Sequence, residues 1–100
     1  MKGRIVFILK LKPGRQEDFL KAYEAIRLDV AHGVKGHIVD QVCQSPDDPD
    51  SWLITSEWTS LDAFLAWERT PEHQDMVKPM RDCWSEARSL KYVVREETGH

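Results

Sequence analysis

The sequence has no long hydrophobic run, no excess of positive charge and no cluster of glycines, and each absence excludes a class of protein. The apolar stretch Ile5–Leu9 is far shorter than the roughly 18–20 residues that a membrane-spanning helix needs. The 14 Lys and Arg residues are scattered and are outnumbered by 17 Asp and Glu residues, so no nucleic-acid surface is predicted. The five glycines are isolated, which excludes a phosphate-binding loop and a flavin or nicotinamide domain.

Cysteines are few as well. Cys43 and Cys83 are far apart in the sequence, and we expect two reduced, buried thiols rather than a disulfide. The first residues superficially suggest a secretory signal peptide. Their apolar part is short, however, charge returns at Lys10, and no small-residue cleavage site follows. We therefore expect a cytoplasmic protein.

The hydrophobic periodicity predicts one domain over residues 1–100 with the order β-α-β-β-α-β. We expect strands at 4–11, 36–44, 51–58 and 90–95, and helices at 15–31 and 60–88. The second helical region should be interrupted at Pro71, which suits the first position of a new helix, and again at Pro79. The tail at 96–100 should be frayed.

This order predicts a ferredoxin-like α+β fold with a four-stranded antiparallel sheet, because crossover connections are right-handed. Helices from two crossovers can cover only one face of such a sheet. The first strand is nevertheless apolar on both faces, with Ile5, Phe7 and Leu9 on one and Val6 and Ile8 on the other. We expect a homodimer in which two sheets pack face to face as a dimeric α/β barrel.

The segment 51–79 carries the strongest sign of function. A strand of alternating large residues leads into a short helix with Phe64 and Trp67 three residues apart on one face. A second helix start, Thr70-Pro71-Glu72, follows and carries His73. An aromatic wall, an imidazole and a broken helix are what a small pocket for a flat organic ligand needs.

His73 is the candidate base of this pocket. The positive end of its helix should disfavour imidazolium, and a neutral imidazole can accept a phenolic proton. The alternative is an exposed first-turn residue without a role. Trp67, the other candidate catalytic residue, is either a cavity wall or plain core.

The region after Pro79 shows two helical stripes. Met76, Met80, Cys83 and Ala87 form an expected core stripe, and Val77, Arg81, Trp84 and Arg88 form its neighbour. On a helix, Arg81 and Arg88 would flank Trp84 closely enough to stack on its ring. This is either surface packing or a substrate site in which Trp84 contacts the ligand and one arginine holds its anionic oxygens. The spacing does not decide between Arg81 and Arg88.

The predicted second strand carries His37 and Asp40. Regular alternation places these two side chains on opposite faces, so one of them must face an apolar layer and find a polar partner there. His37 is therefore a further candidate for substrate binding. A metal site built from His32, His37 and His73 lacks any recognisable ligand spacing, and we expect no metal.

The F-x-x-W run of Phe64 and Trp67, with the elements around it, resembles the antibiotic biosynthesis monooxygenase family. The resemblance implies a small dimeric protein that binds an aromatic substrate and uses no cofactor, as many members do when they oxidise phenolic polyketides. It also implies that Trp67 lines a cavity between helices and sheet, that His73 stands where relatives often have tyrosine, and that a late arginine reaches the site.

The chain departs from this resemblance in having no asparagine. The better-known cofactor-free oxygenases use one a turn before the tryptophan, where this chain has Ala63. Haem-degrading relatives need an asparagine on the first strand, around Phe7, and a histidine where this chain has Val77. Three hypotheses stay open: a cofactor-independent monooxygenase of an aromatic polyketide or similar phenol, a polyketide cyclase with the same pocket, and a non-catalytic dimeric ligand-binding module.

Overall fold

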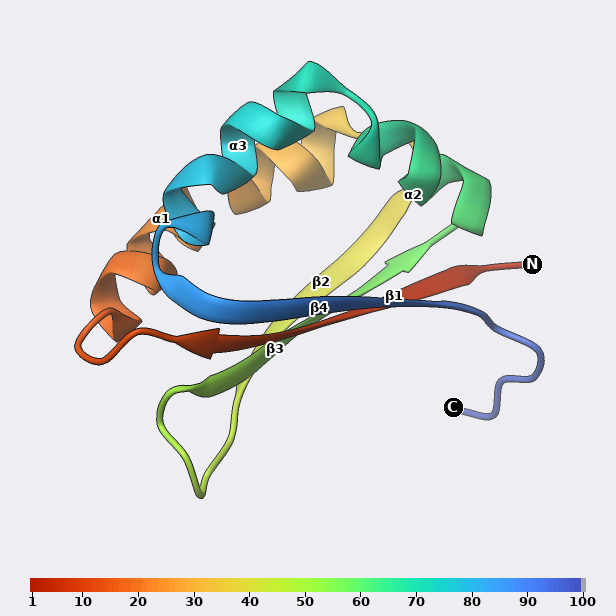
Figure 1. Cartoon of the computed structure of the whole chain (residues 1–100). Coiled ribbons are helices and arrows are strands. Elements are labelled where there is room, and N and C mark those ends of the chain that lie inside the picture. The colour runs from red at the N-terminus through yellow and green to blue at the C-terminus, as the bar shows by residue number, and fades with distance from the viewer. Residues whose placement is uncertain (100) are drawn as a thin grey trace.

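The computed structural model describes residues 1–99, without the side chains of residues 31 and 32. Seven elements follow one another: β1 (Gly3–Leu11), α1 (Gln16–Gly33), β2 (His37–Gln44), β3 (Ser51–Trp58), α2 (Leu61–Glu68), α3 (Pro71–Arg81) and β4 (Trp84–Val93). The strands form one antiparallel sheet in the order β2-β3-β1-β4. The three helices cover one face of this sheet (Figure 1). The predicted ferredoxin-like fold is confirmed.

The break between α2 and α3 lies where the sequence predicted it. The Ser60 hydroxyl accepts a hydrogen bond from the amide of Ala63 and so caps α2. The Thr70 hydroxyl accepts one from the amide of His73 and caps α3, with Pro71 at the first helical position. Of the two caps, Thr70 lies at the break itself, where its hydroxyl also donates a hydrogen bond to the Trp67 carbonyl at the end of α2.

The predicted extension of the last helix to Arg88 is wrong. Helix α3 contains Pro79 without restarting, and it ends at Arg81. Strand β4 begins at Trp84, well before the predicted start at Leu90, and it pairs with β1 along that strand's whole length. Pairing with the central strand overrides the helical periodicity of these residues. Arg88 consequently belongs to the sheet.

The helix-covered face contains the core. One cluster of buried residues comprises Leu9, Leu11, Phe19, Trp52, Met80 and Cys83, and a second comprises Ile5, Trp58 and Phe64. The expected core stripe therefore holds for Met80 and Cys83. It fails for Ala87, which is exposed on β4.

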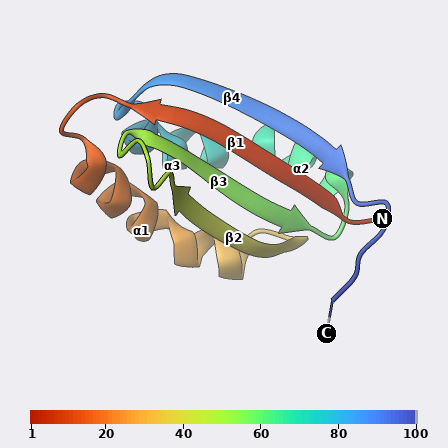
Figure 2. The ribbon, with the colours of Figure 1, turned by 90° about the horizontal axis from the view of Figure 1, so that it is seen from below.

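Figure 2 shows the other face of the sheet, which no helix covers. Ile8 lies on this face because its neighbours Phe7 and Leu9 point to the helices, and its side chain is exposed. Tyr92, opposite Arg4, is exposed on the same face. We call this surface the open face; the homodimer that would cover it stays a prediction.

Two further predictions concern the cysteines and the C-terminal tail. Cys83 is buried, but Cys43 is exposed on edge strand β2, which corrects the expectation of two buried thiols; both are free. Residues 96–99 of the expected tail lie outside any helix or strand, and His100 lies outside the described residues. Among the described helices, none combines the length and the apolar composition that crossing a membrane requires.

Candidate active site

A cavity of about 150 Å³ lies between the helices and the covered face of the sheet. Its apolar lining comes from the sheet, from the long helix α1 and from the broken pair α2 and α3. The apolar residues are Ile5, Phe7, Ile26, Val30, Ile54, Trp58, Phe64, Trp67, Met76, Val77, Met80 and Trp84. A cavity of about this volume in another protein admits one benzene ring, so an aromatic group fits here.

The break between α2 and α3 forms the aromatic end of this cavity. Trp67 and His73 meet edge to face, with ring centroids 5.5 Å apart and an interplanar angle of 80°. Phe64 packs in the same manner on Trp58, at 5.3 Å. All four rings line the cavity, so Phe64, Trp67 and His73 come together as the sequence predicted.

His73 is half-buried at this end of the cavity. Burial lowers the pKa of His73 below its ordinary value of 6.5, while Glu68 raises it and the Arg81 guanidinium lowers it. The expected neutral imidazole is therefore supported, although burial is a larger cause than the helix end that the sequence suggested. Within the described chain, the Nδ1 atom of His73 is buried without a hydrogen-bond partner. The imidazole thus keeps one nitrogen for which the described chain supplies no partner.

The aromatic side chain of Trp84 reaches the cavity by a different route from the one predicted. It enters from the start of β4 and packs on Phe7, with ring centroids 5.1 Å apart. Neither predicted arginine accompanies it. Arg81 is exposed on α3 and donates a hydrogen bond to Gln74, and Arg88 pairs with Ile8 and so belongs to the open face. The expected stacking of both arginines on Trp84 along one helix is therefore wrong.

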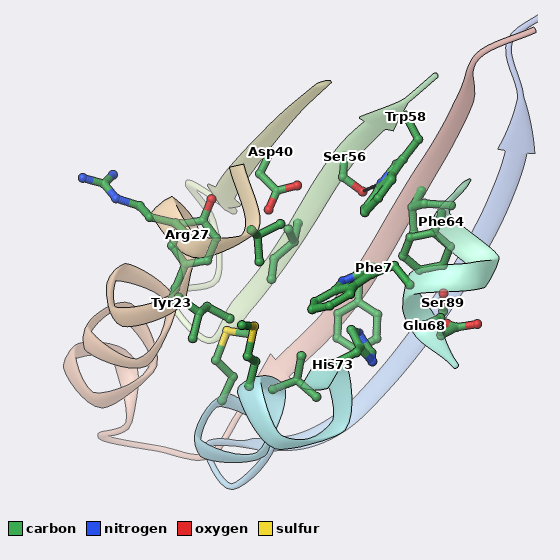
Figure 3. A pocket seen from close by; sticks show the side chains of 18 of the residues that line it. Phe7, Tyr23, Arg27, Asp40, Ser56, Trp58, Phe64, Glu68, His73 and Ser89 are labelled. Atoms are coloured by element: carbon green, nitrogen blue, oxygen red, sulfur yellow. Dashed lines mark hydrogen bonds between the residues drawn. The ribbon is translucent and has the colours of Figure 1, made fainter. Parts of the chain in front are cut away.

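The arginine that does line the cavity is Arg27, on α1. Sequence reasoning missed it, together with four other polar lining residues, Tyr23, Ser56, Glu68 and Ser89, whereas Asp40 was already singled out on the second strand (Figure 3). Tyr23 was hidden by its helical spacing, which fits a plain core position. The other positions carry no sequence signal, because only the packing of α1 over the sheet brings them together.

A bulge in β2 explains where His37 goes. The pairing of β2 with β3 shifts between His37 and Val39, so His37 lies opposite Trp58 and Asp40 lies opposite Ser56. Both side chains consequently face the helices, whereas regular alternation had separated them. His37 does not line the cavity; its Nε2 lies 2.8 Å from Oδ1 of Asp40, which does.

Ala63 also lies outside the cavity lining. It packs against Gly36, where an added Cβ would stand 2.6 Å from the Cβ of Ala63, and Gly36 has a φ of +89°. Phe64, one residue later, occupies the place on the cavity wall. The cavity wall contributed by this part of α2 is therefore apolar, and among the described residues the cavity lining contains no amide side chain.

Groups that could ligate a metal do not gather: the described residues contain no cluster of three or more His, Cys, Asp and Glu side chains. The predicted set of three histidines is only partly testable, because the side chain of His32 lies outside the described residues. His37 is instead engaged by Asp40.

Sequence comparison identifies relatives from Streptomyces species. The chain is 48% identical over 95 residues to the 42.8 kDa protein in the whiE locus of Streptomyces coelicolor, covering 95% of this chain and 24% of that protein. It is 45% identical over 95 residues to SchA of Streptomyces halstedii, covering 95% and 25%. Polyketide synthase CurD of Streptomyces cyaneus is 40% identical over 96 residues, covering 96% and 25%. The chain spans about a quarter of the length of these relatives.

Solved structures share the fold at low sequence identity. SnoaB, a cofactor-independent oxygenase from Streptomyces nogalater, superposes with a TM-score of 0.84 at 15% identity, covering 99% of this chain and 98% of that one. A conserved protein from Methanosarcina mazei gives a TM-score of 0.82 at 17% identity, covering 92% and 91%. The family model described as antibiotic biosynthesis monooxygenase matches residues 4–79. The chain belongs to the antibiotic biosynthesis monooxygenase family.

Proposed function

We propose that this chain is a cofactor-independent monooxygenase that oxidises an aromatic polyketide or a similar phenol. Family membership supports the reaction class. The relatives support the substrate class, since one of them is named a polyketide synthase. The observation that carries the proposal is His73: a neutral imidazole with an unpartnered, buried nitrogen, set among aromatic walls.

The first step is proton transfer to His73. An electron-rich phenol or anthrone held against Trp67 and Phe64 loses a proton to the imidazole, which is within the same cavity. The lowered pKa of His73 keeps the base unprotonated near neutral pH. The carbanion-like anion of the substrate is then electron-rich enough to reduce dioxygen directly.

The oxidation of an anthrone methylene to a carbonyl balances with dioxygen alone. Both C–H bonds of the methylene break, and the four electrons that reduce dioxygen come from the substrate. One oxygen atom becomes the new carbonyl oxygen, and the other leaves as water with the two hydrogens. The protein supplies a base, orientation and exclusion of water, which suits an aromatic cavity. Arg81 and Arg88 do not line the cavity, and the Arg27 guanidinium points away from it, so no arginine is assigned to the anion.

Ala63 favours a second candidate, a polyketide cyclase or a ligand-binding module. No amide side chain takes its place at the aromatic end of the cavity, so a group that relatives use toward oxygen chemistry is lacking. A cyclase needs the same base and cavity but consumes no dioxygen. A binding module would use the cavity walls and leave His73 idle.

Oxygen uptake distinguishes these candidates. Purified protein treated with chelator is mixed with a panel of anthrones and naphthols in an oxygen electrode, with a Gln74→Ala variant as a folded, active control. We expect uptake stoichiometric with quinone formation for at least one substrate. Ring closure without uptake would identify a cyclase, and saturable binding with no turnover would identify a binding module. A stoichiometric flavin, haem or transition metal in the active protein would also overturn the proposal.

A further inference from the structure

The cavity has a second polar end, at β2 and α1, that the chemistry of His73 does not use. Asp40 lies there, and Figure 3 shows it on the far side of the cavity from His73. Carboxylates are rarely placed against aromatic and aliphatic walls without a partner, because desolvating them costs free energy. The surroundings of Asp40 show how this carboxylate is held and what it can bind.

His37 holds Asp40 in place. The Nε2 atom of His37 is 2.8 Å from Oδ1 of Asp40, and the side chain of His37 is only 4% exposed. The imidazole ring also packs edge to face on Trp58, with centroids 5.2 Å apart. This packing prevents the ring from turning away, so the carboxylate has a fixed direction. The β-bulge is what places the two residues on one face.

The hydrogen bond to His37 engages Oδ1 of Asp40 and leaves Oδ2 free to accept another hydrogen bond. Asp40 keeps 21% of its side chain exposed and lines the cavity. In the described part of the chain, no hydrogen bond to Oδ2 complements the one at Oδ1. A carboxylate oxygen accepts hydrogen bonds and never donates one, so the missing partner must be a donor.

Tyr23 lines this end of the cavity from α1, and Arg27, one turn later on the same helix, lines its rim with the guanidinium pointing outward. Burial raises the pKa of the Tyr23 phenol, and the negative charge of Asp40 raises it further, while Arg27 lowers it. The phenol and the carboxylate therefore sense each other across this end of the cavity. Tyr23 stays protonated beside Asp40, so its hydroxyl is a second polar group at this end of the cavity.

We propose that Asp40, positioned by His37, accepts a hydrogen bond from a second hydroxyl of the substrate and so makes the site selective for aromatic compounds that carry hydroxyls on two different rings. The inference rests on the proposed function, because it takes the occupant of the cavity to be a phenol. Asp40 is a specificity-determining residue, and His37 is a positioning residue. His73 accepts a proton from one end of the ligand, while Asp40 accepts a hydrogen bond from a hydroxyl at the other end.

Anaerobic binding measurements test this without requiring turnover. The ligands are a naphthol with one hydroxyl and a series of dihydroxynaphthalenes with one hydroxyl on each ring, followed by tryptophan fluorescence. A hydrogen bond to a charged group should tighten binding of the best dihydroxynaphthalene by about tenfold over the naphthol. The Asp40→Asn variant should reduce this preference to about twofold or less, since the amide lacks the charge.

His37 variants separate positioning from folding. His37→Leu should abolish the preference while naphthol affinity stays within about twofold, and His37→Gln, which retains a donor toward Asp40, should restore part of it. Asp47→Asn, an exposed carboxylate in the β2–β3 turn, is the matched control and should change nothing. An unchanged preference in Asp40→Asn would overturn the proposal, as would equal affinity of the native protein for both ligand types or no binding of either. Retained preference without oxygen uptake would instead refute only the oxygenase.

Discussion

The two faces of the sheet differ in what covers them, although β1 offers apolar residues to both. On the covered face Ile5 and Leu9 are 3% and 2% exposed, whereas Ile8 on the open face is 40% exposed. A strand that is apolar on both sides indicates two packing partners. The three helices are one partner; within the described residues no element is the other, and the homodimer that would supply it stays a prediction.

The faces also differ in their polar residues. The open face pairs its charges with one another: Lys2 and Arg4 lie 3.0 and 3.3 Å from the carboxylate oxygens of the buried Glu57. The covered face has polar groups in an apolar setting, where His73 Nδ1 is left without a partner within the described chain. Unsatisfied buried groups cost free energy. We interpret the covered face as the functional face and the open face as the assembly face.

The largest effect is expected from His73→Ala on the covered face. A general base contributes on the order of 10²–10⁴-fold to rate, so the variant should lose most of its turnover with an anthrone. Its thermal stability should change little, because a partly buried, unpartnered imidazole is replaced. Full turnover in this variant would show that the base lies elsewhere, with Asp40 the next candidate.

On the open face, Ile8→Glu should dissociate the protein. A charge introduced into a sheet-to-sheet contact is desolvated without a partner, and this should weaken self-association by on the order of a hundredfold or more. Light scattering at micromolar concentration should give about 23 kDa for the native protein, twice the chain mass of 11.6 kDa, and a monomer for the variant. Leu28→Glu, an exposed residue on α1, is the control and should stay dimeric. A native monomer would contradict the assembly role of this face.

The pH dependence sharpens the assignment of His73. Because its pKa is lowered in the folded protein, turnover should fall as the pH drops through a value below 6.5. The unfolded chain binds the proton more readily in that window, so stability contributed by the neutral imidazole should also decline as the pH falls below 6.5. His73→Gln should lose both dependences, measured by pH–rate profiles and by denaturant unfolding. An acidic limb that persists in this variant would assign it to another group.

The smallest effect is expected from Trp67→Phe, which separates a cavity wall from plain core. As a wall, the smaller ring should weaken naphthol binding by about tenfold or less and leave stability almost unchanged. As core, the same change should cost about 1–3 kcal/mol of unfolding free energy and leave binding intact. Titration and denaturant melts on the same samples distinguish the two outcomes.

The sequence predicted the fold and one half of the site. Caps at Ser60 and Thr70 and the spacing of Phe64, Trp67 and His73 are local signals, and the local structure follows them. The start of β4 was missed because residues after Pro79 have helical periodicity, and pairing with β1 is a long-range interaction that this periodicity does not report.

The other half of the site depends on features that have no signature in the sequence. The bulge at His37 and Val39 shifts the alternation of β2 by one residue, which turns His37 and Asp40 toward the same side. Tyr23 and Arg27 reach the cavity only because α1 packs across the sheet beside them. The bulge and the packing of α1 arise from tertiary interactions, and no periodicity in the sequence encodes either of them.

Isotope labelling of the product tests the central claim most directly. Chelator-treated protein is given an anthrone under labelled dioxygen, and the quinone is examined by mass spectrometry. We predict one labelled oxygen atom in each product molecule, located at the new carbonyl, with the second labelled atom in water. A product without label, or one formed equally well in the absence of dioxygen, would contradict monooxygenation on the covered face of this sheet.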